Sequence, residues 1–435
     1  MRSRDFSITD RASFVEQTPT SFRVHSSVYY DADVFRDEMR LIFDKSWVYV
    51  GHESQLAEAG DYITGRIGTQ PTIVTRNESN DVTVLLNVCR HRANAICRED
   101  RGNSSNFRCP YHGWTYTNTG HLIGVSDRAR YPQDFDSGML DLIQAPMVGT
   151  YRGLIFASLS EEVSPLDDHL SLIRPHIDLW ADRSIEGDPT VLLPHKYSYP
   201  GNWKFQAENG VDGYHPGVTH ESAFSSYAAH GMGTGRPVVK HGHISRGFPG
   251  GHSTIEGGYD DARGIGTSMK DHYQHYMTEL TERHGDERAE QITTNRHLFI
   301  FPNVFIMDDL IRVVQPIAPD ETDVYSYPIR LGGVSDEFNA RRLYETTRSL
   351  STTGLLNPAD LEMFAANQTG LSARKMEWLQ LHRGLGQEEV WETGERVGVL
   401  ADETAQRALF IQWAACMAGN EVKEVESTLA SRSAT

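Results

Sequence analysis

The spacing of apolar positions changes along the chain, and the change separates regions with different secondary structure. In residues 31–44, apolar side chains recur near helical spacing behind Asp31, a residue type that caps helix N-termini, which predicts an early helix. From Ser46 to about Leu159 the pattern becomes short runs of β-branched and aromatic residues, such as Trp47–Val50, separated by turn residues. This second region is typical of a small antiparallel β domain.

Beyond Pro165 the pattern mixes helices and strands. We expect a helix around residues 269–284, another near Ser335 and a third at Asn357–Pro358, with Asn as the N-cap and Pro at the first helical position. Strand-like runs lie at residues 297–307, 311–317 and 323–331. Their order predicts an antiparallel meander, whereas the glycine-rich interval 231–266 has no regular pattern and is typical of a lid-like insertion.

The length of the chain bounds its domain organisation. A chain of 435 residues can form at least two hydrophobic cores. We therefore predict the α+β class in three parts. Residues 1–45 form a helical segment that packs on the third part, residues 46–160 form the small antiparallel β domain, and residues 161–435 form a larger domain with an antiparallel sheet flanked by helices.

Composition and charge exclude several kinds of protein. Apolar residues make up 39% of the chain and no run approaches the roughly 18 consecutive residues that cross a bilayer. The N-terminus lacks the apolar core of a signal peptide, so we expect a cytoplasmic protein that does not enter a membrane. A formal charge of -18 disfavours nucleic-acid binding.

Cys97 and Cys416 lie far apart in the sequence, which predicts buried thiols in a reducing compartment rather than a disulfide.

Two half-motifs, Cys89-x-His91 and Cys109-x-x-His112, stand seventeen residues apart. Each offers one thiolate and one imidazole, as a Rieske [2Fe-2S] cluster requires, because one of its irons binds two cysteines and the other binds two histidines. Structural zinc also accepts two cysteines and two histidines, but zinc fingers usually keep the cysteines in one half and the histidines in the other. The spacing therefore favours a Rieske cluster held by these four residues.

A second set of candidate ligands lies downstream, where His215 and His220 are five positions apart and Asp212 precedes the first of them by three. Two histidines and one carboxylate form the usual site of non-heme ferrous iron in oxygenases. Asp212 could fix the orientation of a ligand ring. Asp360 is a candidate third ligand, but a carboxylate in the first turn of a helix also satisfies backbone N–H groups, so these residues alone leave the third ligand open.

From about residue 30 to 420 the chain resembles the α subunits of Rieske non-heme iron aromatic-ring-hydroxylating oxygenases, and most of all their benzoate, toluate and anthranilate dioxygenase branch. The matching segments are Ile96–Asn103, Cys109–Trp114, Gly201–Gly210, Phe301–Val304 and Asp360–Glu362. The last segment carries the family's third iron ligand, which the resemblance places on Asp360, with Glu362 as the second choice. Asn94 and Tyr111 stand where high-potential Rieske proteins carry a disulfide, so the resemblance implies a cluster of lower potential.

The chain departs from the family pattern at two places. Ala93 replaces a glycine that commonly follows the first half-motif, and Pro216-Gly217 replaces larger residues between the two ligand histidines. Both changes affect loop shape more than ligation. The second lies beside the expected substrate cavity and leaves the substrate open.

The resemblance implies a terminal oxygenase α subunit that uses dioxygen and NADH-derived electrons to convert an aromatic carboxylate to a cis-dihydrodiol. The alternative is a Rieske monooxygenase that hydroxylates a salicylate-, arylamine- or alkylbenzene-type ring. A pure electron-transfer Rieske protein is a remote alternative, because it would need only the β domain. A buried substrate carboxylate would need an anchor, for which Arg296 and Arg312 are candidates.

The same resemblance implies an assembly and its partners. A separate reductase, with or without a ferredoxin, would supply electrons, because the chain has no convincing dinucleotide-binding motif. A small β subunit would complete an α3β3 complex, or the chain would form a homotrimer. Asp212 would then bridge His215 to the partner subunit's His112. Asn209 resembles a family asparagine near the iron, and a purely structural hydrogen bond explains it equally well.

Overall fold

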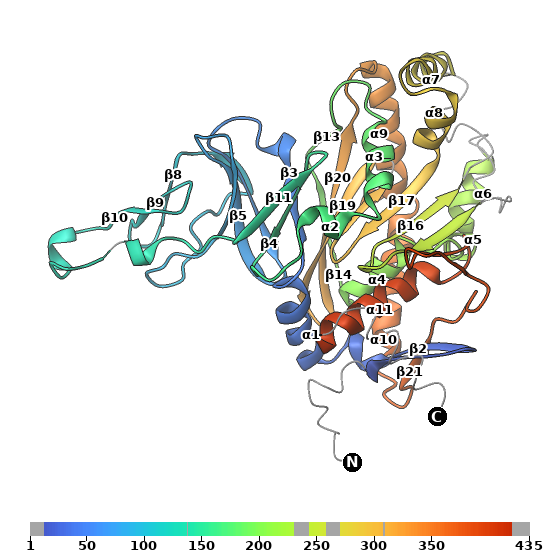
Figure 1. Ribbon diagram of the computed structural model, residues 1–435, viewed down its shortest axis with the longest axis horizontal. Coiled ribbons are helices and arrows are strands. Elements are labelled where there is room, and N and C mark those ends of the chain that lie inside the picture. The colour runs from blue at the N-terminus through green and yellow to red at the C-terminus, as the bar shows by residue number, and fades with distance from the viewer. Residues whose placement is uncertain (1–12, 137, 230–242, 258–269, 308, 420–435) are drawn as a thin grey trace. The chain divides into compact units, whose positions relative to one another are not determined.

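The computed structural model describes residues 13–136, 138–229, 243–257, 270–307 and 309–419 (Figure 1). The chain divides into two compact units. The first, which we call the β unit, is Phe43–Leu166, and the second, the mixed unit, joins the described residues of Met1–Ile42 to those of Asp167–Thr435. None of the helices within the described ranges combines the length and apolar character that a bilayer crossing requires.

The β unit consists of three antiparallel sheets, as the short β-branched runs predicted. Its strands are β3 (Val48–His52), β4 (Asp61–Ile67), β5 (Gln70–Arg76), β6 (Val82–Leu86), β7 (Arg101–Asn103), β8 (Asn106–Arg108), β9 (Thr115–Thr117), β10 (Leu122–Gly124), β11 (Met147–Tyr151) and β12 (Leu154–Ser158). They pair in the orders β6-β5-β4-β7, β11-β12-β3 and β10-β9-β8. Cys89 and Cys109 are part of the buried core of this unit, together with Phe107, Trp114 and Tyr116.

A ten-stranded antiparallel sheet forms the centre of the mixed unit. Its strands are β13 (Thr190–Val191), β14 (His195–Tyr199), β15 (Ile244–Gly247), β16 (Ser253–Gly257), β17 (Asn295–Ile300), β18 (Val304–Met307), β19 (Leu310–Ala318), β20 (Glu321–Arg330), β22 (Glu389–Val390) and β23 (Arg396–Val399). The order is β13-β20-β19-β18-β17-β16-β15-β23-β22, and β14 also pairs with β20. A small sheet combines β1 (Val15–Thr18), β2 (Ser21–His25) and β21 (Trp378–Gln380).

Helices flank the large sheet. They are α1 (Ala32–Glu38), α2 (Leu166–Leu170), α3 (Arg174–Ala181), α4 (Trp203–Asn209), α5 (Pro216–Thr219), α6 (Glu221–Ala229), α7 (Lys270–His284), α8 (Asp286–Thr293), α9 (Asp336–Leu350), α10 (Asn357–Gly370) and α11 (Thr404–Ala418). Helix α11 lies along β15 and β16, α4 contacts β19, α9 contacts β20, and α10 contacts both α4 and β14 (Figure 1). The predicted α+β class, with a helix-flanked antiparallel sheet, is confirmed.

The predicted meander is present with one more turn than expected. β17, β18, β19 and β20 pair successively and antiparallel, but the single strand predicted at residues 297–307 is two strands that meet at a turn. The turn contains Pro302, which has no N–H to donate to a sheet ladder and therefore ends a strand. The prediction of a single strand rested on the run of apolar residues and did not take Pro302 into account.

Three other local predictions need correction. Asn357 is not the N-cap of α10, because the helix begins at Asn357 itself and the cap position is Leu356. The first 45 residues are not only helical, since the β1–β2 hairpin precedes the helix that Asp31 caps. Within the interval 231–266, residues 243–257 form β15 and β16 of the large sheet, and the rest lies outside the described residues.

Candidate metal centres

Two loops present the cysteines and histidines of the half-motifs, and they share one hydrogen-bond pattern. In each loop the cysteine N–H donates to the carbonyl five residues later, and the cysteine carbonyl accepts from the N–H four residues later. The bonds are Cys89 N to Asn94 O at 2.9 Å, Ala93 N to Cys89 O at 2.9 Å, Cys109 N to Trp114 O at 2.7 Å and Gly113 N to Cys109 O at 3.0 Å. We call Cys89–Asn94 and Cys109–Trp114 the cluster loops.

The shared pattern requires a left-handed backbone at the same place in both loops. Gly113 adopts φ 73° and Ala93 adopts φ 56°. Glycine reaches this region without a steric penalty and alanine does not, which explains why glycine is the common residue at the position of Ala93. Ala93 thus preserves the geometry of its loop, although its left-handed backbone is strained.

The thiols are buried, whereas the imidazoles lie nearer the surface. Cys89 and Cys109 are each 2% exposed, and the hydroxyl of Tyr116 lies 3.4 Å from Cys89 Sγ. The rings of His91 and His112 are 4.6 Å apart between centroids. His91 Nδ1 is buried without a hydrogen-bond partner, so this nitrogen is suited to bind a metal. Two thiols on the inner side and two adjacent imidazoles on the outer side fit a [2Fe-2S] cluster of the Rieske type.

The same residues do not gather around a single point. Among the described residues, three ligand atoms lie within 4.8 Å of one another in one place only, and that place is not at the cluster loops. Tetrahedral zinc, with bonds of about 2.0–2.3 Å, would bring all four ligand atoms closer together than this. The geometry therefore favours a binuclear cluster over the zinc alternative.

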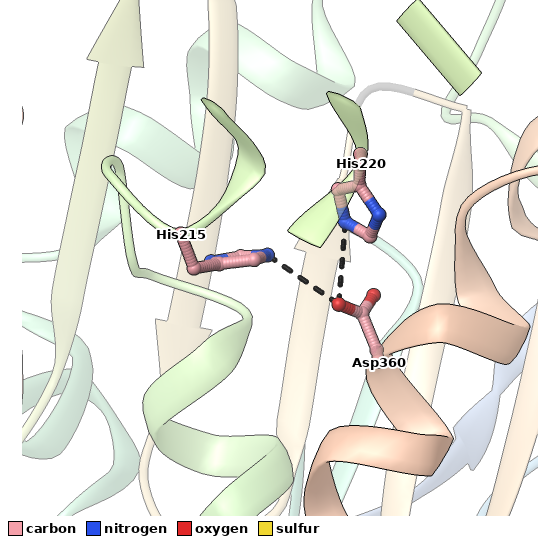
Figure 2. A group of neighbouring side chains, drawn as sticks. All are labelled: His215, His220 and Asp360. Atoms are coloured by element: carbon pink, nitrogen blue, oxygen red, sulfur yellow. Dashed lines mark ion pairs between the residues drawn. The ribbon is translucent and has the colours of Figure 1, made fainter. Parts of the chain in front are cut away.

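Within the described ranges, the one group that does converge is His215, His220 and Asp360, which we call the triad. His215 immediately precedes the short helix α5 and His220 immediately follows it, so a single turn of chain sets both rings toward one point. Figure 2 shows the two rings directed at the carboxylate of Asp360 on α10. Asp360 Oδ1 lies 3.4 Å from His215 Nε2 and 3.2 Å from His220 Nε2.

Burial and charge act on the triad together. Burial alone would raise the pKa of Asp360, but the two histidines hold the pKa of this carboxyl well below its usual range. Burial alone would lower the pKa of His215, but Asp212 and Asp360 raise it to about 9. Nδ1 of His220 is buried without a hydrogen-bond partner. Two imidazole nitrogens and one ionised carboxylate, all facing one point, are the donor set that ferrous iron takes in oxygenases.

The structure brings two further predicted residues to the triad. Asn209 Nδ2 lies 3.2 Å from His215 Nε2 and donates to Asp360 Oδ1 at 3.3 Å. Asp212 Oδ1 accepts from the N–H of His215 at 3.0 Å and lies 3.5 Å from Nδ1 of the same ring. Glu362, the second choice for the third ligand, is exposed on α10 and is not part of this group.

A buried charge cluster fixes the helix that carries Asn209. Glu38 of α1 is fully buried and accepts from Lys204 Nζ at 2.5 Å. It also accepts from the indole N–H of Trp203 at 3.0 Å and from that of Trp413 at 2.7 Å. Because these bonds join α1, α4 and α11, the end of α4 has a defined position beside the triad.

A cavity of about 140 Å³ opens onto the triad. Its polar wall contains the triad together with Asn209 and Asp212, and apolar side chains such as Phe224, Ile255 and Leu356 line other parts of it. Arg312 also lines the cavity. An apolar cavity with a few convergent polar groups is the usual form of a site for a small organic ligand.

One charged group of this cavity was missed by the sequence interpretation. Glu256 on β16 lines the cavity and lies 3.2 Å from Arg296 Nε and 3.0 Å from His176 Nδ1. No local motif marks Glu256. Its role depends on the pairing of β16 with β17, which places Glu256 directly opposite Arg296.

Comparison with known proteins assigns both units. Residues 46–137 match the model of the Rieske [2Fe-2S] domain, and residues 188–397 match that of the ring hydroxylating alpha subunit catalytic domain. Together these two models imply a Rieske cluster, a mononuclear iron and electrons from a separate reductase.

The chain is also similar to curated large subunits of dioxygenases. It is 35% identical to the 2-halobenzoate 1,2-dioxygenase large subunit of Burkholderia cepacia, over 85% of this chain and 82% of that protein. It is 32% identical to the anthranilate 1,2-dioxygenase large subunit of Acinetobacter baylyi, over 84% and 81% of the two chains. For the toluate 1,2-dioxygenase subunit alpha of Pseudomonas putida the identity is 33%, over 82% and 80%.

Solved structures share the fold. A naphthalene 1,2-dioxygenase bound to phenanthrene superimposes with a TM-score of 0.86 at 22% identity, over 99% of this chain and 100% of that one. The naphthalene 1,2-dioxygenase from Rhodococcus sp. bound to indole gives a TM-score of 0.79 at 28% identity, over 91% and 94%. The chain belongs to the family of Rieske-type aromatic-ring-hydroxylating dioxygenase α subunits.

Proposed function

We propose that this chain is the α subunit of a terminal oxygenase that dihydroxylates an aromatic carboxylate to a cis-dihydrodiol. The observation that carries the proposal is the convergence of His215, His220 and Asp360 on a cavity with apolar walls. The names of three relatives support the substrate class, since halobenzoate, anthranilate and toluate are all aromatic carboxylates. Those names also place the reaction of the relatives at ring positions 1 and 2.

In this proposal the triad holds ferrous iron, and Cys89, Cys109, His91 and His112 hold the cluster. The iron supplies dioxygen activation and the cluster supplies electrons. The protein's part is to place the ring beside the triad and to exclude water with the apolar walls of the cavity. Asn209 donates to the Asp360 carboxylate and thereby orients it.

Asp212 is the proposed bridge between subunits of a trimer. Oδ1 of Asp212 accepts from the N–H groups of Tyr214 and His215, and its other carboxylate oxygen has no partner among the described residues. That second oxygen could accept a hydrogen bond from the partner subunit's His112. Such a contact would give electrons a short hydrogen-bonded route from the cluster of one subunit to the triad of the next.

The remaining partners follow from the same proposal. The relatives are large or alpha subunits of multicomponent dioxygenases, which supports a separate reductase, with or without a ferredoxin, and a small β subunit in an α3β3 complex. Use of NADH from the metabolic pool would place the enzyme in the cytoplasm.

Product analysis tests the proposal. The holoenzyme, with its electron donor, is incubated with substituted benzoates and with neutral aromatic rings under isotopically labelled dioxygen. We expect a cis-dihydrodiol of a benzoate that carries two labelled oxygen atoms. A phenol with one labelled atom would establish the monooxygenase alternative instead. Electron transfer without oxygen incorporation into any ring would contradict both.

A further inference from the structure

The cavity beside the triad is lined by one deeply buried arginine, Arg312 on β19. Its side chain is 2% exposed. Its Nη2 donates to Asn357 Oδ1 at 3.4 Å, and its guanidinium lies 6.0 Å from the centre of the Tyr197 ring. Its Nε is buried and has no hydrogen-bond partner. Within the described part of the chain, no carboxylate forms an ion pair with Arg312.

The sheet register explains why Arg312 lacks an anion. Directly opposite Arg312 stand Phe305 on β18 and Ser326 on β20, and neither carries a charge. Cross-strand neighbours are the side chains that most readily neutralise a charge in a sheet. A buried guanidinium with only neutral partners is energetically unfavourable, and an entering carboxylate would remove that cost with two parallel hydrogen bonds.

Arg296, the other arginine considered from the sequence, has a different environment. Its cross-strand partner is Glu256, and Arg296 Nη2 donates to Glu256 Oε2 at 3.3 Å. Burial would raise the pKa of Glu256, but His176 and Arg296 lower it to about 2, so this carboxylate remains ionised at neutral pH. The charge of Arg296 is therefore already compensated inside the protein.

Arg312 is also connected to the triad through helix α10. Its partner Asn357 precedes the triad residue Asp360 by three positions on α10, which is about one helical turn. Arg312 and the triad line the same cavity. A carboxylate bound at Arg312 would therefore hold its aromatic ring in the cavity that the triad also lines.

We infer that Arg312 binds the carboxylate of the aromatic substrate and that Arg296 does not. The inference rests on the proposed function, because it assumes that the substrate is an aromatic carboxylate. The inference names Arg312 as the residue that makes the cavity select anionic over neutral rings.

The test compares benzoate with benzamide, its uncharged analogue, in the holoenzyme. For Arg312→Gln we expect the Kd of benzoate, measured by calorimetry, to rise about 100-fold, because a buried charged partner is removed. The KM for benzoate should rise in parallel, kcat should fall less, and benzamide binding should not change. Arg312→Lys keeps the charge but loses the planar fork, so its benzoate affinity should lie between the wild type and Arg312→Gln.

Arg296→Gln is the matched control, since it also removes one buried arginine near the cavity. It leaves Glu256 without its cross-strand partner, so we expect a lower unfolding temperature but an unchanged ratio of benzoate to benzamide affinity. Wild-type affinity for benzoate in Arg312→Gln, or an equal loss in the two glutamine variants, would overturn the inference. A wild-type enzyme that hydroxylates neutral rings and no benzoate would instead overturn the substrate class of the proposed function.

Discussion

The cluster loops and the triad show two ways in which one chain can assemble a proposed set of metal ligands. The cluster loops lie within residues 89–114, and each loop is closed by hydrogen bonds between its own backbone groups. The triad takes two ligands from one turn around α5 and the third from α10, at Asp360, far along the sequence. The first site depends on local backbone geometry, and the second depends on how α4, α5 and α10 pack.

This difference predicts that the two sites can be damaged separately. A change in a triad ligand should leave the cluster loops intact, because no ligand of the cluster lies in the same compact unit. A change in the cluster loops should likewise spare the triad.

Asp360→Ala should abolish turnover and remove the mononuclear iron. The variant leaves two imidazoles and no carboxylate facing a buried point. Loss of a carboxylate ligand should lower activity by more than about 100-fold, the upper range for residues that only support a ligand. Metal analysis should show loss of the mononuclear iron, and the visible spectrum of the [2Fe-2S] cluster should remain.

Glu362→Ala is the control, two residues further along the same helix and exposed to solvent. It should retain iron and activity. Bleaching of the cluster in Asp360→Ala would contradict the independence of the two sites, and loss of iron in Glu362→Ala would reassign the third ligand.

The contrast also explains what the sequence could predict. Cys89, His91, Cys109 and His112 are recognisable because a local pattern contains the whole ligand set. His215 and His220 were proposed as ligands in the same way, whereas the proposal of Asp360 needed the resemblance to a family, since a carboxylate in the first turn of a helix has an ordinary structural role. The α+β class and the meander followed from the spacing of apolar residues, but the turn at Pro302 was overlooked.

The choice between Arg296 and Arg312 could not be made from the sequence at all. Arg312 lies within a strand-like run, and Arg296 immediately precedes another. Which of them meets an acid depends on the register between strands, since Glu256 faces Arg296 across β16 and β17. Register is set by the packing of a whole sheet, and a single run of residues does not contain it.

Glu208→Gln should stabilise the mixed unit without affecting the cluster. Burial raises the pKa of Glu208 from 4.5 to about 7, although the Tyr29 hydrogen bond and the Lys204 charge oppose the shift. As pH rises from 4.5 toward 7, the unfolded chain therefore loses this proton first, and the free energy of unfolding falls across that window. Glutamine keeps an acceptor for the Tyr29 hydroxyl, which donates at 2.7 Å, and has no proton to lose.

The expected gain at pH 8 is up to about 3 kcal/mol, and at pH 4.5 it should shrink to about 0.4 kcal/mol. Denaturant unfolding followed by tryptophan fluorescence at both pH values measures it, while cluster absorbance reports the β unit separately. An equal gain at both pH values would show that ionisation of Glu208 is not the cause.

Asp212→Asn should slow electron delivery to the triad without changing metal binding. Asparagine preserves an oxygen that can accept from the N–H groups of Tyr214 and His215, but it removes the charge proposed to bridge to the partner subunit's His112. We expect a 10- to 100-fold lower steady-state rate, the range for a residue that orients a ligand. Iron content and the cluster spectrum should be unchanged, and the rate of electron transfer from the prereduced cluster should fall with turnover. Undiminished turnover would contradict the bridge.

The smallest expected effect, on stability, concerns the left-handed position that the two cluster loops share. One loop has alanine there and the other has glycine. Ala93→Gly should relieve the strain of φ 56° and stabilise the holoprotein by about 1 kcal/mol, partly offset by the greater freedom of glycine in the unfolded chain. The reciprocal change, Gly113→Ala, should destabilise more, because a Cβ there would lie 2.9 Å from Ser126 Oγ as well as adopt φ 73°. The temperature at which cluster absorbance bleaches should rise for the first variant and fall for the second. A fall for Ala93→Gly would mean that its methyl group contributes a contact which outweighs the backbone strain, and that the two loops are not equivalent.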